Sequence, residues 1–251
     1  MEYNSIISVY LCKKTKRMKT KVWPFSIRIF HWLLAIGFAS AYILGEDHDL
    51  RKYHIAFGLM VGCLILFRLL YGVFGPKYAR FGDFPIGLKH QMGFIRSFFR
   101  KSVNYIGHNP LAAITMLAIL IVGLLTSLSG FLLYGGEHGI LNVQINEHSL
   151  EEGHEVLANL FLALVVFHLA GLLVETLIHK NIGTLSSMFS GNKNLEGESI
   201  KENIFQRFYG LIWIFIPIII FILSLKLNSG AGSDTDHEHE REHYEHHDDD
   251  D

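Results

Sequence analysis

Four histidines stand in long apolar stretches, where a titratable ring is costly and marks a functional site. They are His31, His54, His154 and His168. His154 and His168 are 14 residues apart, which is nearly four helical turns, so both lie on one face of a helix, roughly 21 Å apart along its axis. One buried histidine can simply bond to a backbone carbonyl. Four of them at two depths point to metal ligation, because neutral imidazole is a common metal ligand.

The segments that must position these histidines are long enough to cross a bilayer. Half of the 251 residues are hydrophobic and the mean hydropathy is +0.28. A helix that crosses a membrane needs about 20 apolar residues. The apolar segments of this sequence also lack the polar face that a helix of a soluble protein has. The sequence therefore predicts an all-α membrane protein with no nucleic-acid partner. The predicted spans are residues 24–45, 54–75, 110–134, 153–178 and 209–227.

Lysine and arginine in the connections predict the orientation, because cytoplasmic loops are enriched in them. The N-terminal tail contains KKTKRMKTK, and the connections 76–109 and 179–208 are basic, whereas 135–152 has four glutamates and no Lys or Arg. We predict a multi-pass protein of the bacterial inner membrane, with a cytoplasmic N-terminus and a periplasmic C-terminus. Residues 1–22 lack the apolar core of a cleavable signal, and Met18 is an alternative start to Met1.

With this orientation the histidines fall into two levels. His54 and His154 open their spans at the outer side, whereas His31 and His168 lie toward the inner side. Each level has two imidazoles from two different helices, which suits a planar iron porphyrin held from both faces in a helix bundle. Mononuclear zinc or copper needs three or four ligands at one depth. Two axial histidines leave no open iron position, so the chemistry is electron transfer, with no catalytic residue.

Arginines and glycines near the histidines fit the same interpretation. Arg68 follows His54 by 14 residues and Arg28 lies one turn before His31, so either guanidinium could pair with a propionate of the inner haem. The alternative is that they extend toward lipid phosphates. Glycines would give flat rings room against a helix backbone, although small residues also serve ordinary helix packing in membranes. These glycines are Gly37, Gly58 and Gly171.

The stretch KVWPFSIRIFHWLLAIGF resembles the start of the prokaryotic cytochrome b561 family, which includes the b-type cytochrome subunits of nickel–iron hydrogenases. The resemblance continues through HIAFGLMVGCLILFRLLYGVFGPKYARF, GHNPLAAITMLAILIVGLLTSLSGF and GHEVLANLFLALVVFHLAGLL, covering about residues 21–190. It implies two b haems, one ligated by His31 and His168 and the other by His54 and His154. It also implies electron transfer between a membrane quinone pool and a redox protein. Tyr71 stands where the family often has Trp, and the fifth span and the tail lie outside the shared core.

The predicted organisation has five parts: a basic cytoplasmic tail (1–22), a four-helix dihaem cytochrome b domain (23–190), a cytoplasmic linker (191–208), a fifth transmembrane helix (209–228) and a disordered, His-, Asp- and Glu-rich periplasmic tail (229–251). Residues 88–102 mix basic and aromatic side chains at helical spacing, which predicts a helix in the inner headgroup region. The His-rich acidic tail cannot build a core, although such tracts also bind divalent metals.

The predicted function is transmembrane electron transfer, as the electron-transfer subunit of an oxidoreductase system. The expected partners are membrane lipid, a quinone, and a periplasmic hydrogenase or c-type cytochrome, with a homodimer left open. Two alternatives remain: a superoxide-oxidising cytochrome, as in some relatives, and a metal-handling membrane transporter. The His-rich tail supports the transporter, but the chain lacks inverted repeats and paired mid-membrane helix breaks.

Overall fold

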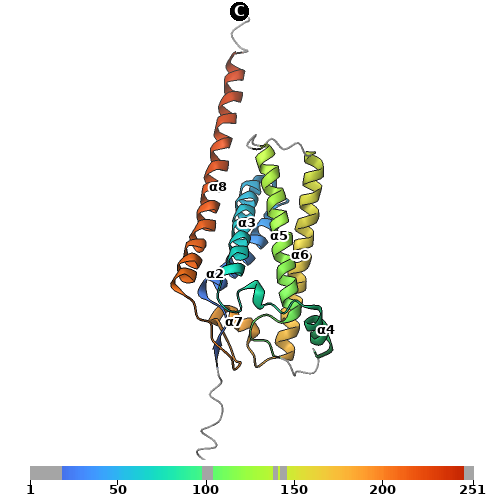
Figure 1. Cartoon of the computed structure of the whole chain (residues 1–251). Helices are drawn as coiled ribbons and strands as arrows, with labels where there is room; N and C mark the ends of the chain where they lie inside the picture. Colours follow the sequence, from blue (N-terminus) through green and yellow to red (C-terminus); the bar gives the residue numbers. More distant parts are fainter. Residues whose placement is uncertain (1–18, 98–103, 138–140, 142–145, 246–251) are drawn as a thin grey trace, which may run out of the picture. The chain divides into compact units, whose positions relative to one another are not determined.

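The structure, a computed structural model, is almost entirely helical (Figure 1) and describes residues 19–97, 104–137, 141 and 146–245. It confirms the predicted all-α membrane fold. Short 3-10 turns occupy His48–Leu50 and Phe81–Asp83. The other elements, in chain order, are β1 (Thr20–Lys21), α2 (Phe25–Leu44), α3 (Arg51–Phe74), α4 (Leu88–Ser97), α5 (Pro110–Glu137), α6 (Glu147–Ile178), α7 (Thr184–Ser190), β2 (Asn192–Lys193) and α8 (Ile204–Glu245).

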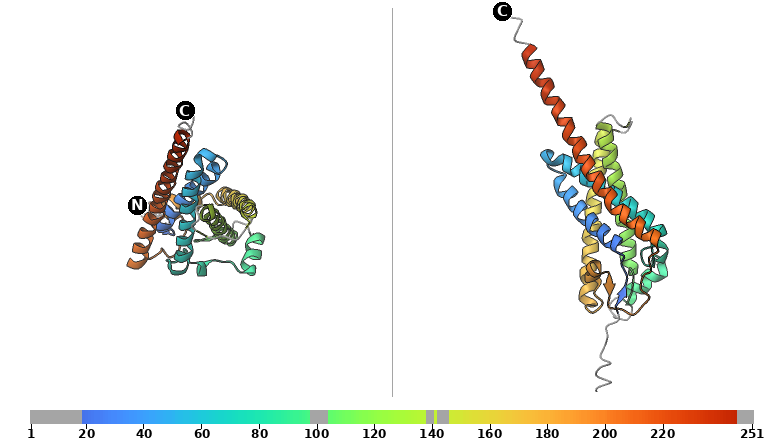
Figure 2. Two further views of the ribbon diagram at one scale, coloured as in Figure 1. Left: turned by 90° about the horizontal axis from the view of Figure 1, so that it is seen from above. Right: turned by 90° about the vertical axis from the view of Figure 1, so that its left-hand side faces the viewer.

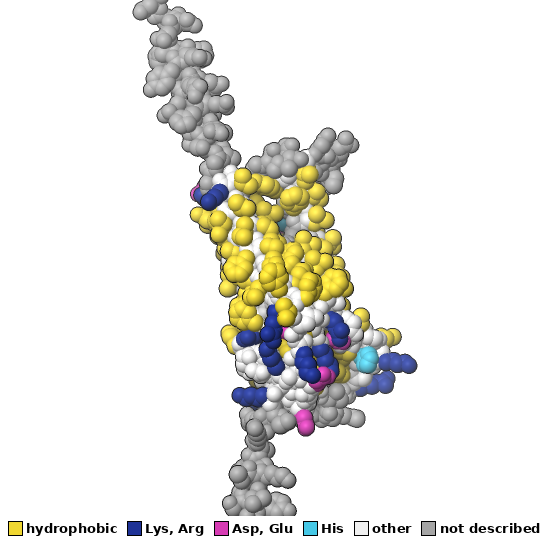
Figure 3. Space-filling view, turned by 60° about the vertical axis from the view of Figure 1, so that its left-hand side comes forward, with side chains coloured by type: hydrophobic (Ala, Val, Ile, Leu, Met, Phe, Trp, Pro, Cys, Tyr) yellow, Lys and Arg dark blue, Asp and Glu magenta, His cyan; other side chains and the backbone are white. Residues whose placement is uncertain are grey.

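Five helices within the described residues are long and apolar enough to cross a membrane: Phe25–Leu44, His48–Phe74, Pro110–Gly136, Glu147–Ile178 and Ile204–Leu227. Each corresponds to one predicted span. Many of their large hydrophobic side chains are exposed, and they form a broad uncharged area on the face drawn in Figure 3. Such a surface is stable against lipid rather than water.

Polar residues at the helix starts explain why the helices begin where they do. The Asn109 side chain accepts a hydrogen bond from the Ala112 amide at 2.8 Å, and Pro110 takes the first helical position, where no amide donor is needed. At the start of α8, Asn203 Oδ1 accepts from the Gln206 amide at 2.7 Å and Gln206 Oε1 accepts from the Asn203 amide at 3.1 Å. This reciprocal capping box starts α8 five residues before the predicted position 209.

Two other predicted segments differ from the structure in their bounds. The backbone of α8 is helical as far as Glu245, past the boundary predicted at 228 from the change in composition. The last proline of the chain is Pro217, so no later residue lacks an amide donor for the helix. The predicted headgroup helix is α4, which ends at Ser97, and residues 98–102 lie outside the described part.

The chain packs into two compact units. Unit 1 consists of Met1–Arg28, Leu70–Ile119 and Ala163–Phe208, and unit 2 of Ile29–Leu69, Leu120–Leu162 and Tyr209–Asp251. Each of the five long helices therefore contributes one segment to each unit. In unit 2, α8 packs on α3 through aromatic rings: Phe57 and Phe221 have centroids 4.6 Å apart, and Phe67 stacks on Trp213 at 5.9 Å.

Unit 1 contains a two-stranded antiparallel sheet that the sequence did not predict. β1 pairs with β2 (Figure 2). Thr20 lies opposite Lys193 in this pairing. Gly191, at φ 79°, ends α7, and its carbonyl accepts hydrogen bonds from the amides of Val22 and Trp23 at 2.8 and 3.1 Å. The positive φ favours glycine here. Residues predicted to be an N-terminal tail and a linker are thus joined to each other.

Lys193 joins a third segment, the loop at Tyr105 and Gly107, to this sheet by hydrogen bonds. Its side chain is buried, and Nζ donates to the carbonyl oxygens of Gly107 at 2.9 Å and Tyr105 at 3.3 Å. The ammonium also lies 5.9 Å from the centroid of Trp23, within the range of a cation–π interaction. Burial lowers the pKa of Lys193 from 10.5 to about 8, against the raising effect of Glu175.

This pKa predicts a pH-dependent stability. Between about pH 8 and 10.5 the unfolded chain holds a proton on Lys193 that the folded chain has lost, so the free energy of unfolding rises with pH across this window. The full increase in the free energy of unfolding across this window is about 3 kcal/mol. We expect the unfolding free energy of the natural protein, minus that of Lys193→Met, to rise from pH 7.5 to pH 10 in detergent. Parallel stability curves would contradict a neutral Lys193 at high pH.

Candidate functional site

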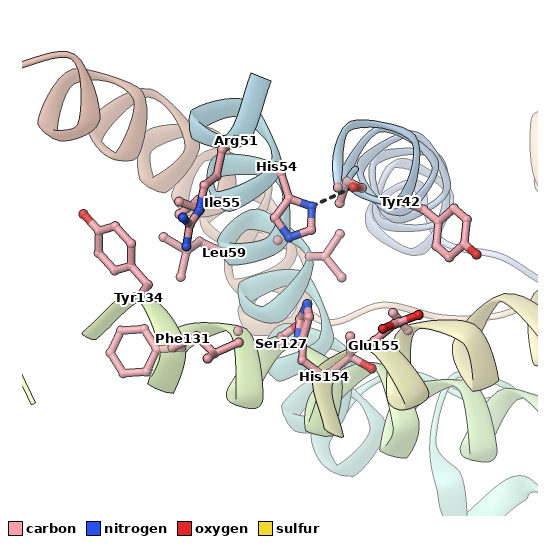
Figure 4. A pocket seen from close by; sticks show the side chains of 18 of the residues that line it. Tyr42, Arg51, His54, Ile55, Leu59, Ser127, Phe131, Tyr134, His154 and Glu155 are labelled. Carbon is pink, nitrogen blue, oxygen red and sulfur yellow. Dashed lines mark hydrogen bonds between the residues drawn. The ribbon is translucent and has the colours of Figure 1, made fainter. Parts of the chain in front are cut away.

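A cavity of about 620 Å³ opens in unit 2 between segments of α2, α3, α5 and α6. This volume is within the range of sites that hold drug-sized molecules and cofactors. His54, in the first turn of α3, and His154, in the second turn of α6, both line the cavity, and they point toward each other in Figure 4. Residues 100 positions apart in the sequence thus face one another across one space.

The spacing of the two rings suits a single metal ion between them. Their centroids are 6.1 Å apart and their planes make an angle of 84°. Metal–nitrogen bonds of about 2 Å on opposite sides of one ion place two imidazole centroids roughly 6 Å apart. The described residues contain no group of three or more His, Cys, Asp or Glu that could hold a metal ion. A metal held by this pair therefore needs equatorial ligands from another source, as a porphyrin provides.

Hydrogen bonds occupy the Nδ1 atom of each histidine. His54 Nδ1 lies 2.8 Å from the carbonyl oxygen of Ala41 on α2 (Figure 4, dashed line), and His154 Nδ1 lies 2.9 Å from Ser129 Oγ on α5. A carbonyl oxygen only accepts, so His54 carries its proton on Nδ1 and keeps the Nε2 lone pair for a metal. A metal-ligating histidine normally has such a partner on its other nitrogen.

Glycines shape the cavity around the rings. Gly58 lines it, and a Cβ atom built on Gly58 would meet no atom within 4 Å. A Cβ on Gly130 would lie 3.0 Å from His154 Cε1, and one on Gly45 would lie 3.2 Å from His54 Nδ1. Open space beside Gly58 suits a flat macrocycle, whereas Gly45 and Gly130 let the histidine rings lie against neighbouring backbone. Gly37 instead allows close packing, since its Cβ would lie 2.7 Å from Met60 Cε.

The other predicted site residues lie elsewhere. His31 is on α2 in unit 2 and does not line the cavity, and His168 is on the part of α6 that belongs to unit 1. Arg68 is buried on α3 in unit 2, with 2% of its surface exposed. Arg28 belongs to unit 1, where its guanidinium donates to the Phe189 carbonyl and lies 5.6 Å from the Phe25 ring. Arg28 therefore connects α2 to α7.

Several residues that line the cavity or contact its histidines were not predicted. Ser129 is one of several hydroxyl residues in its helix, and nothing in the sequence pattern connects it to His154. Arg51 lines the cavity three residues before His54 (Figure 4), but in the sequence it is one charge in a mixed loop. Tyr42 donates to Asn159 Oδ1 at 2.8 Å, which joins α2 to α6 at the cavity wall. The spacing of Arg51 and His54 along one helix was the signal available for Arg51.

Comparison with known proteins identifies the family of the chain. The family model described as prokaryotic cytochrome b561 matches residues 22–191. The probable Ni/Fe-hydrogenase B-type cytochrome subunit of Rhizobium leguminosarum bv. viciae is 22% identical, over 72% of this chain and 91% of that protein. No solved structure gives a significant match. The resemblance inferred from the four sequence motifs is confirmed, and the chain belongs to the prokaryotic cytochrome b561 family, as a multi-pass membrane cytochrome b that acts with b-type haem in electron transfer.

Proposed function

We propose that the chain carries electrons across the bacterial inner membrane, between the quinone pool and a periplasmic redox partner, with two b haems. The partner class is a hydrogenase or a c-type cytochrome. The observation that carries the proposal is the facing pair His54 and His154, 6.1 Å apart in a cavity of about 620 Å³. Two histidines that held one haem would leave its iron no open position for oxygen, which favours electron transfer.

His54 and His154 are assigned to the outer haem. When bound, the haem iron supplies a one-electron couple. The protein holds the two imidazoles with Nδ1 bonded to Ala41 and Ser129, leaves room for the ring at Gly58, and surrounds it with apolar walls such as Phe38 and Phe161, whose centroids are 4.2 Å apart. Burial and ligand orientation are how a protein sets a haem potential.

His31 and His168 are assigned to the inner haem on their depth in the sequence and on their place in the family motifs. Arg68 is proposed to pair with a propionate of this haem, because its guanidinium, 2% exposed on α3, is of the side-chain type that binds carboxylates through two parallel hydrogen bonds. We retain Arg28 as a weaker candidate, since its guanidinium already donates to Phe189. The proposed orientation, with a cytoplasmic N-terminus and a periplasmic C-terminus, follows the Lys and Arg distribution.

The proposal is tested by counting haems in the full purified chain. We expect two b haems per polypeptide, two steps in a potentiometric titration followed by absorbance, and reduction of both by a quinol analogue. A single haem would contradict the inner assignment. A colourless preparation that binds zinc would favour the metal-handling alternative.

Acidic side chains at the cavity predict how the partner approaches. Glu46, Asp47, Glu151 and Glu155 line the cavity and are exposed, together with the cation Arg51. A negative surface beside the outer site attracts a basic partner and raises the rate of encounter. The expected partner face is therefore positively charged around its redox centre.

Reversing part of this charge should slow the encounter. In the double variant Glu151→Lys with Glu155→Lys, the rate of reduction of a basic c-type cytochrome at low salt is expected to fall about tenfold, and the natural protein should lose a similar factor as salt rises. Stopped-flow absorbance of the cytochrome measures both. Glu196→Lys is the control, because this exposed glutamate does not line the cavity. Equal slowing by the control would rule out steering at this surface.

A further inference from the structure

The two facing histidines have different kinds of partner behind them. His54 Nδ1 bonds to a main-chain carbonyl, whereas His154 Nδ1 bonds to a side chain, the hydroxyl of Ser129. A carbonyl accepts and cannot donate. A hydroxyl can do either, so the direction of the Ser129–His154 bond has to be inferred from the neighbouring groups. The His154 ring also makes a hydrogen bond with the Thr126 backbone, whose carbonyl can only accept.

A second hydrogen bond of Ser129 indicates this direction. Ser129 Oγ lies 2.9 Å from the carbonyl oxygen of Thr126, one turn earlier in α5. The hydroxyl has one proton, and the Thr126 carbonyl can only accept it. The Oγ lone pair then faces His154, 2.9 Å away, and accepts from Nδ1–H. The bonds therefore run in one direction from His154 to Ser129 to Thr126, and a chain of this kind strengthens each member.

The surroundings of Ser129 keep this arrangement dry and fixed. Ser129 is 8% exposed, so little water competes for its hydroxyl. The next residue, Gly130, lets the His154 ring lie against α5, since a Cβ there would be 3.0 Å from Cε1. Residues 129 and 130 thus hold both the tautomer and the position of the ring, which faces His54 across the cavity.

We infer that Ser129 is a positioning residue for the outer haem: by accepting the Nδ1 proton of His154, it keeps Nε2 available to iron and lowers the reduction potential of that haem relative to the same site without the hydroxyl. The inference rests on the proposed function. An acceptor on Nδ1–H makes the imidazole a stronger electron donor and favours the ferric state. Ser129 acts through His154 and has no contact of its own with the haem in this assignment.

The experiment compares Ser129→Ala, Ser129→Thr and Ser127→Ala in the full haem-loaded protein. Ser127 is a matched control, because it lies in the same helix and lines the cavity, and its described contact is with Gly62 rather than with a histidine. We expect Ser129→Ala to move one of the two potentiometric steps to a more positive value, and to weaken outer-haem binding roughly 10- to 100-fold. The other step should stay in place. Ser129→Thr, which keeps the hydroxyl, should restore both properties.

The outcomes separate this inference from the proposed function. Two haems with unchanged potentials and unchanged affinity in Ser129→Ala overturn the inference and leave the dihaem function standing. A change in Ser129→Ala that Ser129→Thr does not reverse, or that Ser127→Ala reproduces, also overturns it, because the effect is then one of packing. Absence of haem from the natural protein overturns both. The electron paramagnetic resonance signal of the oxidised outer haem gives a second measurement, which should change in Ser129→Ala only.

Discussion

Replacing His154 with leucine is expected to remove the outer haem and abolish electron transfer to an external acceptor. His54 alone would then have to hold the haem. The haem content of the full chain should fall from about two to about one per polypeptide, and reduction of an external acceptor by a quinol analogue should fall to the uncatalysed background. Haem extraction and stopped-flow absorbance measure these two quantities.

Because His54 and His154 face each other, two further results are expected. His54→Leu should give the same spectrum as His154→Leu, and the double variant should be no worse than either, because both residues act on one group. His148→Leu is the matched control, since His148 lies in the same helix with 77% of its side chain exposed. Two haems remaining in His154→Leu would refute this ligand pair. Haem loss in the control would instead indicate a general failure of α6.

Filling the cavity with a large side chain at position 58 should also remove the outer haem, because the side chain occupies its space and not because a ligand is lost. A leucine at this position meets no protein atom near its Cβ and extends into the space assigned to the porphyrin. The Gly58→Leu protein is expected to fold and to lose the outer haem. Its apoprotein should be more stable to unfolding by up to about 1 kcal/mol, because leucine favours a helix over glycine by this amount.

The control for this variant is Gly136→Leu. Gly136 is in α5, also has no atom within 4 Å of its hypothetical Cβ, and does not line the cavity. This protein should keep both haems and both potentials. Haem content that stays complete in Gly58→Leu, measured beside a normal unfolding transition, would show that the porphyrin lies elsewhere.

The spans were predictable because hydropathy and length act locally. Each predicted apolar block became one helix, and His54 and His154 were recognisable because polar rings are outliers in such a block. Helix ends were less predictable. α6 begins at Glu147, six residues before the predicted start. The Asn146 side-chain oxygen accepts a hydrogen bond from the Ser149 amide at 3.4 Å, which caps the helix within polar sequence.

The contacts behind the histidines could not be predicted from the chain alone. A serine in a membrane helix usually bonds to its own backbone, as Ser129 does to Thr126, so its type does not reveal that it also meets His154, 25 residues away. Lys193 was similarly hidden in a polar stretch predicted as linker, and its burial depends on Trp23 and on the loop at Tyr105. The domain bounds, the ligand roles of His31, His54, His154 and His168, the roles of Arg28 and Arg68, and the number of haems remain predictions.

The pairing of β1 with β2 constrains how many times the chain can cross the bilayer. Thr20 and Lys193 lie opposite each other, so both must emerge on the same side of the membrane. An even number of crossings must therefore separate them, and the four helices α2, α3, α5 and α6 satisfy this parity. It also follows that β1, which is synthesised before β2, waits unpaired until the fourth crossing is complete, so correct insertion of all four helices is a precondition for closing this sheet.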